Sequence, residues 1–464
     1  MKRFIPLVVL FQAVCAGQVV SPSSLDQRSL EYWQEVAGRL MNTGLVEPNS
    51  FELLHELVSG APGRLSGSES SRKAIEITRN MMEKQGFENI RLQPVMVPLW
   101  VRGDMEEAVL YDRSGVATTS LSVCALGGSV GTPDGGTRGE VIEVTSFDEL
   151  RSLGETVKGK VVFFNRPMDP TKLNTREAYR GAVSQRNLGA IEAAAMGGIA
   201  VVVRSMTLAD DDVPHTGMVL YRDSVRAIPA VAISTHGANL LSRLIKEQRD
   251  SKLTIRLSCE NKGMVRSSNV IGEIKGREFP NNIILIGAHL DSWDKGNGAH
   301  DDGAGCVQVI EALALIKRVG LQPKRTIRVV LFENEEMGVR GGLAYRDSLV
   351  RNNEVHVAVV ESDHGGFAPR GFTYEGDSPV SERVLALRPV FEAIDAGRFV
   401  KDYPGVDIMP MVEMGITGFG LDPENHRYFD YHHSDNDTID KVNPRELEMG
   451  AVAIALLAFV VSER

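Results

Sequence analysis

Three near-continuous apolar runs in the C-terminal half of the chain predict strands that are buried on both faces. They lie within residues 281–290, 325–334 and 355–363, and each has the length of a strand rather than of a helix. Residues 303–320 separate the first two runs, and their apolar positions recur with a helical period up to Gly320. Alternating strands and helices imply parallel strands joined by right-handed crossovers. The pattern therefore predicts an α/β fold with a mostly parallel central sheet and helices on both faces.

The N-terminal half shows a different pattern. Residues 22–60 interleave charges with leucines, as amphipathic helices do. Residues 129–261 open with turn residues and continue with short β-rich runs, and they contain no cluster of His, Asp and Glu with catalytic spacing. We expect this segment to be a β-rich domain inserted into a main domain made of residues 22–128 and 262–464.

The first residues have the pattern of an export signal. Lys2 and Arg3 precede an apolar stretch over residues 4–11, and Val14, Cys15 and Ala16 form a small-residue cleavage pattern. We expect a signal peptide over residues 1–16 and a secreted protein, with the lysosome or another compartment of the secretory pathway as alternative destinations. The less favoured interpretation is a buried N-terminal strand.

Composition excludes some classes of partner. The formal net charge is −10, and no strongly basic block occurs, which argues against nucleic-acid binding. The apolar run at residues 451–461 is shorter than the roughly 20 residues that span a bilayer, so it predicts the buried face of a last helix and no transmembrane anchor. Without Cys15, the chain keeps Cys124, Cys259 and Cys306. Three cysteines allow one disulfide at most, and their pairing stays open.

Polar side chains gather where the predicted strands end. His289 and Asp291 close the first strand, Glu335 and Glu336 follow the second, and Asp363 follows the third. Each group alone has an ordinary explanation, such as a core hydrogen bond or a solvated first turn of a helix. However, the carboxyl ends of parallel strands meet at one edge of the sheet, which is where α/β proteins bind ligands. Carboxylates gathered there would repel one another, so a cation is expected.

Two further segments add candidates to this edge. Asp301 precedes the predicted helix at 303–320, and His433 lies in the polar segment 431–438. A set of His, Asp and Glu without a thiolate suits zinc in a catalytic site. Two histidines and three carboxylates are too many for one open zinc site, but they suit two metal ions that share a bridging carboxylate. The residues themselves do not decide which of Glu335 and Glu336 is a ligand.

The motifs HLDSWDKGNGAHDDGAG, ENEEMG, ESDHG and HHSDNDT, taken in this order, resemble those of the co-catalytic zinc aminopeptidase and glutamate carboxypeptidase family of metallopeptidases. The resemblance extends through GRLSGS, VTSFDEL, PHTG and PKRTIR, and so covers nearly the whole mature chain. It implies a zinc exopeptidase fold and makes the inserted segment similar to a protease-associated domain. It also implies a homodimeric carboxypeptidase or dipeptidase that acts on short peptides, most of all unblocked dipeptides.

The resemblance also implies a role for each candidate residue. Asp301 would bridge two zinc ions in each chain, and Glu335 would be the general base that takes a proton from the metal-bridging water. Asp291 would orient His289. The remaining ligands would be Glu336 and His433 at one metal ion, and His289 and Asp363 at the other.

Two alternatives share this fold. One is a non-catalytic receptor or binding ectodomain, although such relatives have lost ligands that are all present here. The other is a glutaminyl cyclase-like acyltransferase with one zinc ion, which lacks the inserted domain. The substrate side chains stay open, as does the preference for carboxypeptidase or aminopeptidase action on longer peptides. His215 in PHTG could reach the cleft, and we expect the sequon at Asn436 to be unused because a glycan would crowd His433.

Overall fold

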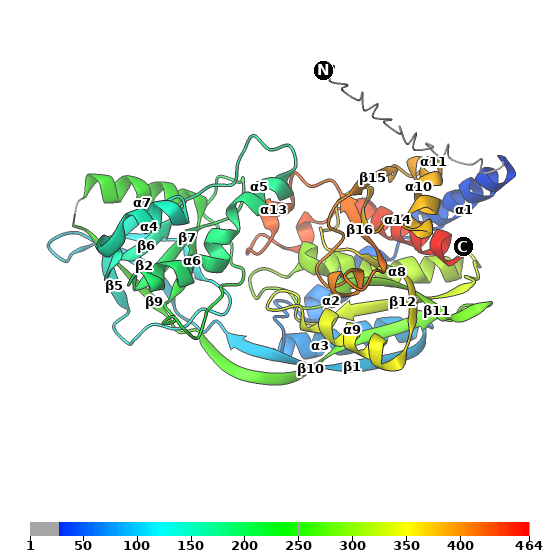
Figure 1. The fold of residues 1–464 in the computed structure, drawn as a ribbon, viewed down its shortest axis with the longest axis horizontal. Coiled ribbons are helices and arrows are strands. Elements are labelled where there is room, and N and C mark those ends of the chain that lie inside the picture. Colours follow the sequence, from blue (N-terminus) through cyan, green and yellow to red (C-terminus); the bar gives the residue numbers. More distant parts are fainter. Residues whose placement is uncertain (1–26, 249, 464) are drawn as a thin grey trace, which may run out of the picture.

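The computed structural model describes residues 27–248 and 250–463, so the expected signal peptide lies outside the described residues. Two lobes, each built on an eight-stranded sheet, are joined by the long strands β1 (Glu88–Val101) and β10 (Glu260–Ile274). Figure 1 shows these two strands running side by side from one lobe toward the other. The chain thus leaves the main lobe along β1 and returns to it along β10.

The main sheet has the strand order β1-β10-β12-β11-β13-β16-β14-β15. Four neighbouring strands at its centre are parallel, whereas β1, β10 and β12 pair antiparallel, as do β16 and β14. The remaining strands of this sheet are β11 (Phe279–His289), β12 (Arg325–Phe332), β13 (Val355–Glu361), β14 (Pro369–Glu375), β15 (Arg398–Lys401) and β16 (Thr417–Pro423).

The sheet is mixed, so the expectation of a mostly parallel sheet is confirmed for the central strands and does not extend to β1, β10 and β14. Its predicted central strands β11, β12 and β13 are parallel, since helical crossovers join them. The antiparallel strand β1 alternates buried and exposed side chains along its second half. That pattern is typical of a sheet with one face in water. Residues 95–101 are nevertheless all apolar, so the sequence does not reveal that one face of this strand is exposed.

Helices cover both faces of the main sheet, as predicted. On one face Ile284 and Ile286 of β11 pack with α8 and α14, whereas Leu285 faces Tyr345 of α9 on the other face. The helix α14 is buried along almost its whole length, as the apolar run at its end predicted. The helices of this lobe are α1 (Gln27–Val46), α2 (Ser50–Gly60), α3 (Glu69–Lys84), α8 (Ala304–Arg318), α9 (Arg340–Asn352), α10 (Pro379–Ala386), α11 (Arg388–Glu392), α12 (Met409–Val412), α13 (Tyr428–Tyr431) and α14 (Pro444–Ser462).

The second lobe is an α/β unit rather than a purely β-rich one. Its mixed sheet has the order β3-β2-β9-β5-β6-β7-β8-β4, so three strands that precede residue 129 belong to it. The strands are β2 (Glu106–Tyr111), β3 (Ala117–Leu121), β4 (Val123–Ala125), β5 (Thr137–Val144), β6 (Val161–Phe164), β7 (Ala200–Arg204), β8 (Ala230–Ile233) and β9 (Lys252–Leu257), and the helices are α4 (Phe147–Ser152), α5 (Thr175–Ala182), α6 (Ser184–Ala195) and α7 (Thr235–Glu247).

The lobes contact each other through α5 and the segment around α13, which lie next to each other in Figure 1. Tyr179 of α5 stacks on Phe429 of α13, with ring centroids 4.6 Å apart. Within the described residues, no helix is long and apolar enough to cross a membrane. The cysteines Cys124, Cys259 and Cys306 are all buried and free, so the fold rests on its hydrophobic core and no two of them form a disulfide.

Candidate metal centre

The candidate residues meet at the carboxyl edge of the parallel strands. His289 ends β11, Asp363 follows β13, and Asp301 lies in the turn that precedes α8. The His289 Nε2 atom is 3.2 Å from Asp301 Oδ1 and 3.2 Å from Asp363 Oδ1. These three side chains could therefore hold one metal ion, since an oxygen of each carboxylate lies within 3.2 Å of the same histidine nitrogen.

The second carboxylate oxygen of Asp301 faces another group of ligands. Asp301 Oδ2 is 3.3 Å from Nε2 of His433, and the same nitrogen is 3.1 Å from Glu336 Oε2. One oxygen of Asp301 thus faces each half of the cluster, which is the arrangement in which a single carboxylate can contact two cations.

The neighbouring residues Asp302 and His432 are less suited to be ligands. Asp302 accepts hydrogen bonds from the backbone N–H groups of His289 (3.1 Å) and Gly305 (2.9 Å), so both of its oxygens are engaged. His432 stacks on His433 with ring centroids 3.5 Å apart, and its Nε2 lies 3.8 Å from Asp301 Oδ2. His432 therefore packs against a candidate ligand and is farther from the shared carboxylate.

Burial of the carboxylates favours a bound cation at this cluster. Asp301 Oδ2 and Glu336 Oε1 are buried and accept no hydrogen bond from the described residues. Burial raises the pKa of Glu336 well above its ordinary value, and the charges of Asp301 and Glu335 raise it further. Burial likewise raises the pKa of Glu335, to which Asp363 adds. Burial and the neighbouring negative charges thus disfavour ionisation of these carboxyl groups. A divalent cation would stabilise their ionised form.

The histidines fit the same interpretation. Burial lowers the pKa of His433 well below its ordinary value, which keeps the imidazole neutral, as a metal ligand must be. At His289, burial lowers the pKa but Asp363 and Asp301 outweigh it and raise the pKa well above its ordinary value. These carboxylates attract a positive charge to Nε2, and a metal ion supplies that charge in place of the proton. The donor set therefore fits zinc.

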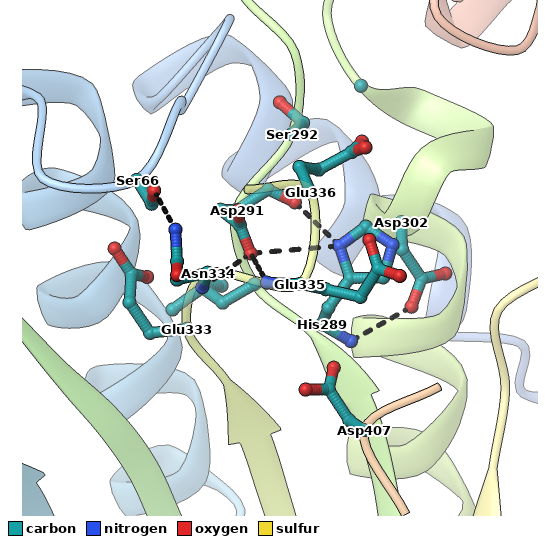
Figure 2. Close-up of polar contacts among 12 residues, drawn as sticks. Ser66, His289, Asp291, Ser292, Asp302, Glu333, Asn334, Glu335, Glu336 and Asp407 are labelled. Carbon is teal, nitrogen blue, oxygen red and sulfur yellow. Dashed lines mark hydrogen bonds and ion pairs between the residues drawn. The ribbon is translucent and has the colours of Figure 1, made fainter. Parts of the chain in front are cut away.

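Asp291 contacts His289 through its main chain. The Nδ1 atom of His289 is 2.9 Å from the carbonyl oxygen of Asp291 and 3.9 Å from its carboxylate. Figure 2 shows the carboxylate pointing toward the loop after β12 instead, where Oδ1 accepts the backbone N–H groups of Asn334 (2.8 Å) and Glu335 (3.0 Å). The side chain of Asp291 thus positions the loop that carries Glu335.

Replacing Asp291 with Ala is expected to lower kcat by about 10–100-fold, the usual cost of removing a supporting group behind a metal site. Zinc content should stay close to that of the wild type, because the backbone carbonyl that holds His289 remains. Asp291→Asn is the matched control, since its amide oxygen can still accept the two N–H groups. Loss of zinc with an unchanged rate per bound metal would show that the carboxylate supports His289 instead.

The GRLSGS segment supports the site from the other side. Ser66 accepts a hydrogen bond from Asn334 Nδ2 at 2.7 Å, and just after the segment Ser71 of α3 donates one to Glu333 at 2.7 Å. Arg64 is fully buried and donates to the carbonyl oxygens of Leu290 (2.6 Å), Asn297 (2.9 Å) and Gly298 (2.8 Å). The loops after β11 and β12 are therefore fixed by residues more than 200 positions away, a role that the sequence pattern did not reveal.

The PHTG segment of the second lobe docks on the main chain of His432 and His433. His215 is buried, and its Nδ1 is 2.7 Å from the His432 carbonyl oxygen. The backbone N–H of Thr216 donates to the carbonyl oxygen of His433 at 2.8 Å. His215 thus reaches the rim of the cluster without entering it. Asn436 is half-buried and contacts Asp211 at 3.4 Å, which supports the prediction that its sequon is unused.

A cavity of about 370 Å³ opens onto the cluster and lies between the lobes. A larger hollow of about 660 Å³, around Arg388 and His426, does not touch these residues. The main lobe lines the cavity with candidate site residues, and the second lobe lines it with basic and aromatic side chains. The lining includes Glu335, Glu336, Asp363 and His433 from the main lobe, and Arg176, Tyr179, Arg180 and Arg186 from the second.

Comparison with known proteins agrees with this geometry. Residues 269–458 match the model of peptidase family M28. Carboxypeptidase Q from Bos taurus is 33% identical over 466 residues, which cover 98% of this chain and 96% of the bovine protein. Carboxypeptidase Q from Homo sapiens is 32% identical over 461 residues, with 97% and 95% covered. The crystal structure of a peptidase M28 precursor from Shewanella amazonensis is similar with a TM-score of 0.89 and 32% identity, and covers 94% of this chain and 98% of the other.

The chain therefore belongs to peptidase family M28 and is a zinc metallopeptidase. Within this family it is a homologue of carboxypeptidase Q over nearly its full length. The resemblance noted from the sequence motifs is thus confirmed. A non-catalytic ectodomain and a one-zinc acyltransferase are set aside as alternatives.

Proposed function

We propose that this protein is an exported dizinc exopeptidase that hydrolyses short peptides, with unblocked dipeptides as its main substrates. The observation that carries the proposal is the position of Asp301, whose two carboxylate oxygens face two separate groups of ligands. Export through residues 1–16 and assembly as a homodimer are parts of the same proposal.

Five residues would hold two zinc ions. His289 and Asp363 would complete one site and Glu336 and His433 the other, with Asp301 shared between them. When bound, the two ions supply Lewis-acid polarisation of the scissile carbonyl group and lower the pKa of water. Glu336 is assigned as the ligand, rather than Glu335, because its Oε2 lies 3.1 Å from Nε2 of His433.

Glu335 would be the general base. It lines the cavity beside the cluster, and its backbone N–H is fixed by Asp291. Burial raises the pKa of its carboxyl group, which brings a carboxylate closer to the pKa that suits proton transfer near neutral pH. Glu335 takes the proton from the attacking water and then delivers it to the amine of the leaving product.

The cavity favours small substrates. Its volume of about 370 Å³ lies at the lower end of the range for small-molecule sites. Both lobes line it, so a long peptide would have to pass between them. The relatives with the most similar sequences are named carboxypeptidases, which supports recognition of a free carboxyl terminus.

Blocking either end of a dipeptide is expected to lower kcat/KM sharply. A buried group that is built to pair with a charged end is left unpaired when that end is acetylated or amidated, and such sites reject the modified substrate strongly. The measurement compares a free dipeptide with its N-acetyl and C-amide forms, in competition with an octapeptide of the same composition. Equal efficiency on the octapeptide or on intact proteins would instead indicate a general aminopeptidase.

A further inference from the structure

Val339 has a backbone conformation that its side chain disfavours. It follows Glu335 and Glu336 on the loop after β12 and directly precedes α9, with a φ of +56° and a ψ of +29°. Asparagine, aspartate and histidine tolerate this left-handed region, whereas a β-branched residue rarely adopts it. Among the described residues, the other non-glycine residues with a positive φ are all asparagine, aspartate or histidine. Within that part of the chain, Val339 is therefore the one strained position of this kind.

Main-chain hydrogen bonds hold the turn around Val339 closed. The backbone N–H of Val339 donates to the carbonyl oxygen of Asn334 at 2.7 Å, and that of Gly338 donates to the carbonyl oxygen of Glu335 at 3.2 Å. The N–H of Leu343 in α9 donates to the carbonyl oxygen of Val339 at 3.1 Å. A glycine would adopt the same conformation without strain, so the turn itself gives no reason for a valine.

The hydrophobic core gives no reason for this valine either. Val339 is half-buried, and it belongs to none of the hydrophobic clusters formed by residues 27–248 and 250–463. By contrast, Met337 on the same loop packs against the cluster that includes the core of the second lobe. Val339 instead lines the cavity that opens onto the metal cluster. The strain is thus retained at a residue of the cavity wall, as is common at binding and catalytic sites.

A second valine lines the same cavity. Val406 is half-buried and, like Val339, lies outside the hydrophobic clusters of the described residues. The carboxylate of Glu361, at the end of β13, accepts the backbone N–H of Val406 at 3.2 Å and those of the next two residues at 3.3 and 3.0 Å. A Cβ atom on Gly342, in the first turn of α9, would lie 2.4 Å from the carbonyl oxygen of Asp407. The start of α9 therefore packs directly on the loop that carries Val406.

We propose that Val339 and Val406 form the apolar wall of a subsite that binds an aliphatic side chain of the substrate, an inference that rests on the proposed function. Among the described residues that line the cavity, Met218 of the second lobe is the only other aliphatic one, and most of the rest are charged or aromatic. Because Val339 follows Glu335 and Glu336 closely in the chain, the bound side chain flanks the scissile bond. Contact with the substrate explains why a valine is retained where a glycine would relieve strain.

The test replaces Val339 with Gly and compares kcat/KM for the free dipeptides Leu-Gly, Gly-Leu and Gly-Gly. In the wild type, at least one leucine dipeptide should be cleaved more efficiently than Gly-Gly, and the position of its leucine identifies the subsite. In Val339→Gly, the ratio of that leucine dipeptide to Gly-Gly should fall by about 10-fold or more, since one methylene group in an apolar pocket is worth about 10–200-fold in kcat/KM.

Stability separates substrate contact from structural packing. Val339→Gly should leave the Tm of the zinc-loaded protein unchanged or raise it, because glycine relieves the strain at this φ. The matched control is Val350→Gly, within α9, where the valine is 60% exposed. This control should lower the Tm, because glycine weakens a helix, and it should keep the wild-type ratio of the dipeptides.

A second variant separates apolar contact from bulk. Val339→Asn keeps a side chain of similar size in a conformation that asparagine tolerates, but its amide group is polar. The ratio of the leucine dipeptide to Gly-Gly should fall as it does in Val339→Gly. A wild-type ratio in Val339→Asn would mean that the side chain only fills space, which overturns the apolar subsite.

Three further results overturn the proposal. One is a Val339→Gly variant with a lower Tm and an equal fall in kcat/KM for all three dipeptides, which makes Val339 a structural residue. Another is a Val339→Gly variant that keeps the wild-type preference for the leucine dipeptide. The third is a wild type that cleaves Gly-Gly as efficiently as both leucine dipeptides.

Failure of the proposed function looks different. An enzyme that cleaves octapeptides as fast as dipeptides, but loses its leucine preference in Val339→Gly, overturns the dipeptide proposal and supports the subsite. An enzyme that is restricted to dipeptides, and whose leucine preference survives in Val339→Gly, overturns the subsite and leaves the proposed function intact.

Discussion

Glu335→Gln is expected to lower kcat by about 10²–10⁴-fold, the range for loss of a general base, while the protein keeps its full zinc content. Glutamine has nearly the same size and keeps the backbone N–H that Asp291 holds, so the loop stays in place. It cannot accept the proton of the attacking water. Rates should be measured under saturating substrate, with metal analysis of the same preparation.

Glu336→Gln is the matched comparison for this experiment. Its side chain contacts His433, so the substitution weakens a ligand and should lower zinc content together with activity. Excess zinc in the assay should restore part of the activity of Glu336→Gln and none of that of Glu335→Gln. The opposite pattern would mean that base and ligand are exchanged between the two residues.

The edge of the main sheet could be predicted from sequence because burial imposes a simple pattern there. Strands β11, β12 and β13 are covered on both faces, so each is a near-continuous apolar run with polar residues at its end or just after it. Parallel pairing then brings His289 and the residues after β12 and β13 to one edge. Asp301 and His433 are candidates by residue type, and only the motif resemblance gives them roles, since no local pattern links them to the strands.

The support around the site could not be predicted in this way. Arg186 lies 247 residues from His433 in the sequence, and their contact depends on how the two lobes dock. An arginine on an amphipathic helix ordinarily points into water, so its position in the sequence carries no signal. The sequence also does not show that Asp291 makes two different contacts. Its main-chain carbonyl oxygen contacts His289, whereas its carboxylate binds the loop after β12.

The extent of the second lobe was hidden for a related reason. Strands β2, β3 and β4 join its sheet although they come before the turn-rich segment at residue 129. They are short, and two of them pair antiparallel with neighbours that lie more than 100 residues later. Pairing between strands so far apart produces no local sequence pattern. The Gly- and Pro-rich segment 131–136 predicts the start of the inserted domain, but it is a loop within the second lobe.

Asp301→Ala is expected to remove both zinc ions and, with them, all measurable peptidase activity. Each of its oxygens faces a different pair of candidate ligands, at 3.2 Å from His289 and 3.3 Å from His433. Removing the carboxylate therefore takes one ligand from each metal ion at once. Metal analysis under zinc-replete conditions should give two ions per wild-type chain and none for the variant.

Asp363→Ala is the control, because it should remove one zinc ion where Asp301→Ala removes both. Asp363 lies 3.2 Å from His289, which belongs to one of the two proposed sites, so its loss should empty that site and leave the ion held by Glu336 and His433. Circular dichroism should show that both variants remain folded. A wild type with a single zinc ion would contradict the shared carboxylate, and so would an Asp301→Ala variant that keeps one tightly bound ion. Either result would reduce the cluster to a mononuclear site and reassign Asp301 as an ordinary ligand.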